Sequence, residues 1–347
     1  MMRPRREVNS QDCRYHLSML LAGDVGGTKT LVGLFRQAGE RPRSVVVREY
    51  ATLDFDNLDE IIGAFIEETG ARDIDAGCIG VAGPVTNNIA RLTNGPWLAD
   101  AAVVSERLGA CPVQLLNDLE AMAHSVPVLE RDELAVLQEG VAMPTGNAAL
   151  IAAGTGLGEA LLLNVGGRFV PSASEGGHAD FSARTRRELA LVEELSPMYG
   201  RVDVERVVSG RGLVNLFHFT HRTTKAGAGC RALGPEVDVT ELPAAVTTAA
   251  LEGRCAQCSE ALDIFVDAYG AEAGNLALRS MATAGIYIGG GIAPKILPAL
   301  ESGRFMDAFR DKEPMVDMLR TLPVKVILNP AAGLLGAAVR AASLQLV

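Results

Sequence analysis

A glycine-rich turn with a threonine at its end follows the first apolar run of the chain. The run closes at Asp24, and the turn consists of Gly26, Gly27 and Thr28. Its spacing is not that of a P-loop, because threonine stands at position 28, where that motif has its second glycine. A strand-like segment comes next, so we expect a β-hairpin whose glycines let phosphate approach the backbone N–H groups. An ordinary hairpin turn is the alternative.

A second turn of the same composition follows another apolar run about 130 residues later. It consists of Gly154, Thr155 and Gly156. It lacks the glycine spacing of dinucleotide-binding folds, and it also leads into a strand-like segment instead of a helix. Two such hairpins at matching places predict two loops that hold a polyphosphate from opposite sides.

Carboxylates stand at the ends of two predicted strands. Asp24 has the right chemistry to hold Mg²⁺, and we expect it to do so through water. Asn117 and Asp118 mark a junction between strand and helix, where a carboxylate is either a helix cap or a base for an attacking hydroxyl. Phosphoryl transfer depends mostly on positioning and charge neutralisation, so one aspartate and one Mg²⁺ suffice.

A short polar segment later in the chain contains Glu175 and His178, separated by two glycines. Glutamate accepts hydrogen bonds from hydroxyl groups, and histidine donates or accepts them. Glu205 lies near another glycine turn. This mixture suits a small ligand rich in hydroxyl groups, whereas solvated surface acids and a satisfied core histidine are the alternative.

The order of elements that would position these residues occurs twice. Each time a strand, a glycine turn, two more strands and then helices follow one another, which predicts two α/β lobes around a cleft. In the second lobe a strand at 284–289 ends in a third turn, Gly289, Gly290 and Gly291. Helical spacing is expected at 56–70, 100–109, 118–127, 186–199, 210–220, 241–252, 254–281, 295–309 and 331–343.

Length and charge limit the classes of function. With 347 residues, two domains are expected. The net charge of −10 argues against nucleic acid as the main partner. No apolar run reaches the roughly 18 residues that span a bilayer, so no membrane association is expected. Residues 1–18 lack an apolar core and are expected to be a disordered extension.

Six cysteines are scattered along the chain, and only Cys255 and Cys258 are close together. A structural zinc site needs about four ligands, and no second Cys/His pair follows. Reduced thiols without a metal are therefore the favoured interpretation.

Taken together and in order, these segments resemble the bacterial glucokinase family of the hexokinase/actin-like ATPase superfamily, from Met19 to the C-terminus. The resemblance rests on LAGDVGGTKT, CIGVAGPV, LTNGPW, LLNDLEAMA, AAGTGLGEA, SEGGHADF, ERVVSGRGLVNLF, AGNLAL, GIYIGGGIAP and NPAAGLLGAA. The GGTK turn at Lys29 is more typical of the related repressor/open-reading-frame/kinase family. That family's cysteine-rich zinc signature does not follow His178, which favours the glucokinase branch.

The resemblance implies a two-lobed actin-like (ribonuclease H-like) fold with a duplicated β-β-β-α-β-α-β core. It implies a small domain at 19–128, joined by a C-terminal helix from about 319 to 347, and a large domain at 129–318. It further implies ATP and Mg²⁺ as cofactors, glucose as substrate, a cytoplasmic homodimer, and closure of the lobes on the sugar.

The resemblance also implies a role for each matching residue. Asp118 would be the catalytic base, and the sugar site would comprise Asn94, Asn117, Asp118, Glu175, His178 and Glu205. The nucleotide site would comprise Asp24 (with Mg²⁺), Gly26, Gly27, Thr28, Gly154, Thr155, Gly156, Gly289, Gly290 and Gly291. The alternatives are a kinase of fructose, mannose or an amino sugar, and a sugar-sensing regulator without catalysis.

Overall fold

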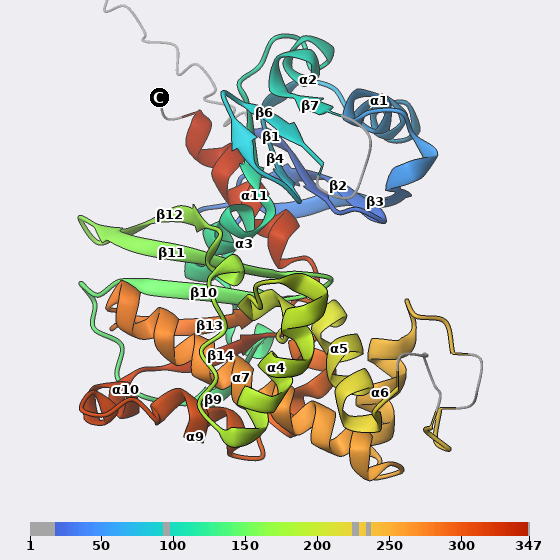
Figure 1. Ribbon diagram of the computed structural model, residues 1–347. Helices are drawn as coiled ribbons and strands as arrows, with labels where there is room; N and C mark the ends of the chain where they lie inside the picture. Colours follow the sequence, from blue (N-terminus) through green and yellow to red (C-terminus); the bar gives the residue numbers. More distant parts are fainter. Residues whose placement is uncertain (1–17, 93–97, 224–228, 234–236, 346–347) are drawn as a thin grey trace, which may run out of the picture.

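The computed structural model describes residues 18–345 except 93–97, 224–228 and 234–236. Asn94 and the predicted extension up to residue 17 therefore lie outside the described residues. Two large mixed β-sheets organise the molecule, each with its own layer of helices (Figure 1).

The first large sheet has five strands in the order β3-β2-β1-β4-β8. Strands β1 to β3 form an antiparallel meander, and β4 and β8 continue the sheet in parallel with β1. The strands are β1 (Met19–Val25), β2 (Lys29–Arg36), β3 (Arg43–Ala51), β4 (Ile74–Val81) and β8 (Val113–Asn117). A small antiparallel sheet follows beside it, made of β5 (Val85–Thr86), β6 (Ile89–Arg91) and β7 (Leu98–Asp100).

The central strands β1 and β4 of this lobe are buried on both faces, as their nearly continuous apolar sequences predict. Leu21 and Ile79 face helices α1 (Leu58–Thr69) and α2 (Ala101–Arg107). Leu20 and Cys78 face the opposite way, against α11 (Ala332–Leu344). Since α11 comes from the far end of the chain, it ties the C-terminus to this lobe.

The second large sheet repeats the pattern with six strands in the order β12-β11-β10-β13-β14-β9. An antiparallel meander again comes first, and β13 and β14 again run parallel to its first strand. Strand β9 adds an antiparallel edge. The strands are β9 (Leu134–Gln138), β10 (Ala148–Ala153), β11 (Leu157–Val165), β12 (Arg168–Ser174), β13 (Gly285–Gly289) and β14 (Val324–Ile327).

One face of this sheet carries the largest apolar core, which seven helices build. They are α4 (Arg186–Tyr199), α5 (Gly210–His221), α6 (Leu242–Leu251), α7 (Ala256–Ser280), α8 (Leu297–Leu300), α9 (Arg304–Arg310) and α10 (Val316–Thr321). The other face packs on α3 (Asp118–Ser125) through Ala123. Helix α3 also contacts β4 and α11, so α3 and α11 lie between the two sheets (Figure 1).

The predicted duplication of the core is thus confirmed, and two predicted helices need correction. The expected helix at 295–309 is broken, because Gly303 adopts φ 101° between α8 and α9. The C-terminal helix that the resemblance implies from about residue 319 begins only at Ala332, because residues 324–327 pair as β14 in the six-stranded sheet; the helix expected from its spacing at 331–343 is confirmed as α11. In the described part of the chain, no helix combines the length and apolarity needed to cross a membrane.

Candidate active site

Parallel pairing brings Asp24 and Asp118 to the same edge of the five-stranded sheet. Asp24 pairs with Gly80 of β4, and Val81 pairs with Asn117 of β8. The carboxyl ends of parallel strands meet at one edge, which is where α/β folds place their ligands. A Cβ atom on Gly80 would lie 3.5 Å from the Asp118 Cα, so β4 also approaches α3 closely here.

Asp118 is the first residue of α3. The side chain of Asn117 caps the helix, with its Oδ1 accepting from the Leu119 N–H at 3.0 Å. Asp118 Oδ1 accepts from the same N–H at 3.0 Å. Burial raises the pKa of Asp118 to about 6, although these hydrogen bonds lower it; the charge of Glu175 adds to the rise. The carboxylate therefore titrates close to neutral pH, as a general base needs.

Asp24 lies beside Asp118 and is affected in the same way. Burial raises the pKa of Asp24 to about 6, and the charge of Asp118 raises it further, against an opposing effect of Lys29. A Cβ atom on Gly333, in the first turn of α11, would lie 2.6 Å from Asp24 Oδ2, so only glycine allows this approach. Two half-buried carboxylates that repel each other fit a divalent cation, whose preferred ligands are oxygen atoms.

The first glycine turn connects β1 and β2 and is held by hydrogen bonds to Gly26. The Gly26 N–H donates to Lys29 O at 3.0 Å, and the Thr52 hydroxyl donates to Gly26 O at 2.8 Å. Within the described residues, the N–H groups of Gly27 and Thr28 have no partner in the protein. They are free to bind an anion, as a phosphate-binding turn requires.

The second glycine turn connects β10 and β11 and is held by Glu205. The Leu157 N–H donates to Glu205 Oε2 at 2.9 Å, and a Cβ atom on Gly156 would lie 2.5 Å from the same oxygen. Gly154 is fixed on both sides, because its N–H donates to Gly156 O and its carbonyl accepts from the Gly210 N–H, each at 2.8 Å. Glu205 thus contacts the second turn directly.

The third glycine turn lies beside the second because β10 and β13 are parallel neighbours, with Ala152 opposite Gly289. Gly290 has φ 83°, and a Cβ atom there would lie 2.3 Å from Ala153 O. A Cβ atom on Gly291 would meet open space. Position 290 therefore requires glycine, because the backbone of Ala153 occupies the space of a side chain. Gly291 has open space beside it and is free to face a ligand.

The Glu175–His178 segment forms a single 3₁₀ turn that Asp203 supports. His178 Nδ1 lies 3.3 Å from Asp203 Oδ2, and His178 Nε2 lies 4.0 Å from Glu175 Oε2. Asp203 is 8% exposed, whereas the side chains of Glu175 and His178 are largely exposed. Asp203 thus orients an imidazole that remains accessible to a ligand.

Asp203 was missed by the sequence reasoning. The sequence offered one signal for it: Asp203 is an acidic residue two positions before the predicted site residue Glu205, in the segment RVDVERVVSG. Asp203 caps the short 3₁₀ turn Val204–Arg206, and Glu205 lies within it, so one turn carries both the residue that supports His178 and the residue that supports the second glycine turn.

Comparison with known proteins identifies the architecture. A family model described as Glucokinase matches residues 21–344. The chain belongs to the glucokinase family. It is 38% identical to a glucokinase of Nostoc punctiforme over 342 residues, which cover 94% of this chain and 100% of the relative.

Solved glucokinase structures share the fold. A glucokinase from an Antarctic psychrotroph superposes with a TM-score of 0.82 at 27% identity, covering 94% of this chain and 100% of that one. A Balamuthia mandrillaris glucokinase, solved in complex with glucose, superposes with a TM-score of 0.77 at 20% identity, covering 96% and 95% of the two chains. The two-lobed actin-like fold predicted from the sequence is confirmed.

Two charged residues near the glycine turns of this glucokinase-family chain have protein surroundings of their own. Lys29 Nζ lies 3.1 Å from Glu49 Oε2 on the neighbouring strand. Glu159 is 2% exposed, and its carboxylate lies under Gly176 of the Glu175–His178 turn. Burial and the nearby Glu272 raise the pKa of Glu159 to about 7, against an opposing effect of Arg279.

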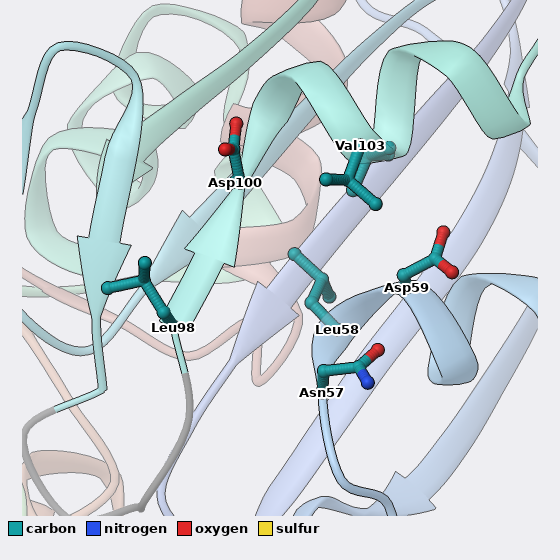
Figure 2. A pocket seen from close by; sticks show the side chains of 7 residues that line it. Asn57, Leu58, Asp59, Leu98, Asp100 and Val103 are labelled. Carbon is teal, nitrogen blue, oxygen red and sulfur yellow. The ribbon is translucent and has the colours of Figure 1, made fainter.

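A separate cavity of about 280 Å³ lies in the small lobe between α1 and α2 (Figure 2). Asp59 pairs with Arg107 across these helices. None of the predicted site residues that the structure describes lines this cavity, so we assign it no catalytic role. Its lining residues are Asn57, Leu58, Asp59, Leu98, Asp100, Val103 and Val104.

Proposed function

We propose that this chain transfers the γ-phosphoryl group of ATP to the 6-hydroxyl of D-glucose, giving glucose 6-phosphate and ADP. One observation carries the proposal: Asp118, with its pKa raised to about 6, shares a sheet edge with Asp24 in a chain of the glucokinase family. Such a carboxylate is poised to accept a proton and then release it near neutral pH.

In the proposed reaction, Asp118 accepts the proton of the glucose O6 hydroxyl as the bond from O6 to the γ-phosphorus forms. The bond between that phosphorus and the bridging oxygen breaks, and ADP leaves. Asp24 would hold Mg²⁺ through water, as an outer-sphere ligand. When bound, Mg²⁺ neutralises charge on the phosphate oxygens.

The remaining predicted residues would position the substrates. Glu175 and His178 would bind sugar hydroxyls, and Asp203 would fix the orientation of His178. The free N–H groups of the first turn, together with the second and third turns, would bind the nucleotide. For Asn94, Asn117 and Glu205 we retain the predicted role at the sugar site, and Glu205 would also fix the second turn.

We further propose a cytoplasmic homodimer whose lobes close on glucose and so exclude water. Light scattering on the purified protein tests the dimer, since it predicts twice the mass of one chain. A monomer across the working concentration range would remove this part of the proposal.

The experiment that tests the function measures ADP release from MgATP by the purified protein with a panel of hexoses. Strong preference for glucose over fructose, mannose and amino sugars is expected, with little release in the absence of sugar. Preference for another hexose would contradict glucose as the substrate. Glucose binding without ADP release would contradict the catalytic proposal and favour a sugar-sensing regulator.

A further inference from the structure

Four metal-ligand side chains converge in the large lobe, on the side of the six-stranded sheet that α4 to α10 cover. They come from the last residue of α5, the connection between α5 and α6, and the start of α7. All their ligand atoms lie within 4.8 Å of one another. The residues are His221, Cys230, Cys255 and Cys258.

The distances within this cluster match those between ligands of a tetrahedral zinc ion. Zn–S bonds of about 2.3 Å and Zn–N bonds of about 2.0–2.1 Å place two sulfurs about 3.8 Å apart, and sulfur and nitrogen about 3.5 Å apart. Cys230 Sγ and Cys258 Sγ are 3.8 Å apart. His221 Nε2 lies 3.4 Å from Cys255 Sγ and 4.0 Å from Cys258 Sγ. A disulfide would instead need about 2.05 Å between sulfurs.

The hydrogen bonds of His221 prepare Nε2 for a metal. Nδ1 lies 3.0 Å from the carbonyl oxygen of Phe217, one turn earlier in α5. A carbonyl only accepts, so Nδ1 carries the proton and Nε2 presents its lone pair to the three sulfurs. The imidazole also stacks on the Phe217 ring, with centroids 4.1 Å apart. The ring is thus fixed in both tautomer and orientation.

The surroundings of the sulfurs suit a closed structural site. Cys230 and Cys258 are 5% and 0% exposed. Cys255 is the N-cap of α7, where backbone N–H groups stabilise a thiolate, and Cys258 lies in the first turn of the same helix. Three cysteines and one histidine form one of the common ligand sets of structural zinc. We propose that these four residues bind one structural Zn²⁺ ion.

The sequence alone favoured metal-free thiols because it showed only the Cys255–Cys258 pair. The fold supplies the other two ligands from 25 and 34 positions upstream of Cys255, as residues 230 and 221. This separation is too irregular for a motif, so only the packing of α5 against α7 reveals the complete set.

The proposed ion would fix α5 at the end remote from the glycine turns. At its other end, the Gly210 N–H donates to Gly154 O in the second turn. A helix of 12 residues is about 18 Å long, so the ion lies roughly that far from the phosphate path. With four protein ligands it has no open coordination position, so its role is structural.

Metal analysis of tag-free protein tests this proposal. After dialysis against metal-free buffer, elemental analysis should find about one zinc per chain, the stoichiometry of a closed four-ligand site. The Cys258→Ser and His221→Ala variants should lose most of this zinc. The matched control is Cys111→Ser, which removes a half-buried thiol outside the cluster and should retain it. Cobalt loading should give thiolate-to-cobalt charge-transfer absorption in wild type.

Two results would overturn the proposal. The first is the finding that wild-type protein contains no zinc and shows no cobalt absorption after loading. Reaction of all its thiols in denaturant would show that the cysteines were reduced and available in that sample. The second is a disulfide between Cys230 and Cys258 in protein purified without reductant. If a variant fails to fold, wild-type protein still decides, because thiol-specific displacement should release its zinc stoichiometrically. Every readout works without glucose or ATP, so the result is independent of the proposed kinase activity.

Discussion

At the scale of single residues, the proposed chemistry depends on two carboxylates that share one sheet edge. Burial raises the pKa of both Asp24 and Asp118 to about 6, and the charge of Asp118 raises that of Asp24 further. The ammonium group of Lys29, which pairs with Glu49, offsets this rise only in part. The site therefore favours binding of a divalent cation, which would stabilise both ionised carboxylates.

The pH dependence of kcat/KM should report Asp118. A base works only when deprotonated, and its raised pKa means that it is half-protonated near pH 6 instead of near pH 4. We expect kcat/KM to be nearly constant above about pH 7 and to fall at least about tenfold per unit well below pH 6. Circular dichroism at each pH controls for acid unfolding. A flat profile down to pH 5 in folded protein would contradict this assignment.

Asp203 gives a second prediction, since it acts through His178. Asp203→Asn removes the carboxylate that accepts from His178 Nδ1, so the imidazole loses its fixed orientation. We expect the KM for glucose to rise roughly tenfold, the worth of one charge-assisted hydrogen bond, with a smaller change in kcat. Asp180→Asn is the control, because that exposed carboxylate pairs with Arg201 instead. Equal effects of both variants would refute the positioning role.

At the scale of elements, helix α3 holds the site together. Its first residue, Asp118, lies at the edge of the five-stranded sheet, while its later residues pack on the six-stranded sheet. Small residues allow α11 to pack closely on it, since a Cβ atom on Gly336 would overlap the Ala121 carbonyl. The proposed base, Asp118, is therefore positioned by a helix that both lobes contact.

The third glycine turn provides a prediction about an element. Gly290→Ala should destabilise the protein by at least about 1–2 kcal/mol, because φ is positive and the Ala153 carbonyl occupies the space of a Cβ atom. Gly291→Ala is the matched control, with open space at its Cβ position. Thermal unfolding of both variants is the measurement. Equal melting temperatures would contradict this description of the turn.

Local patterns in the sequence predicted most helices but not their interruptions. Predicted helices at 186–199 and 254–281 correspond to Arg186–Tyr199 and Ala256–Ser280. The break at Gly303 was missed because apolar spacing continues through it and only the backbone conformation ends the helix. Likewise, nothing local in the sequence reveals that Asp203 lies under His178, since that contact depends on tertiary packing.

At the scale of the whole molecule, the proposed site is divided between two sheets of one duplicated plan. Asp24 and Asp118 come from the five-stranded sheet and its edge, whereas Glu175, His178 and two of the glycine turns come from the other lobe. The duplication was visible in the sequence as a repeated order of strands and glycine turns. The pairing of strands was not, because it depends on contacts between distant segments.

A chain that begins at Met19 should keep wild-type turnover. Met19 starts β1, and its backbone N–H donates to Asp75 within the small lobe, so the shortened chain keeps the whole of β1. We expect kcat and KM within about twofold of the values for the full chain. The removed residues include none of the proposed site residues, and changes away from such residues have small effects. Steady-state kinetics of both proteins provides the comparison. A large loss of turnover would show that residues 1–18 contribute to activity.

The central claim is that Asp118 accepts the proton of the sugar hydroxyl, and its most direct test compares turnover with glucose affinity in Asp118→Asn. The account predicts a kcat lower by about 10²–10⁴-fold, the usual worth of a general base, with glucose binding retained by calorimetry. Glu120→Gln, a change in the same turn of α3, should keep its turnover. Near-normal turnover in Asp118→Asn would contradict the account.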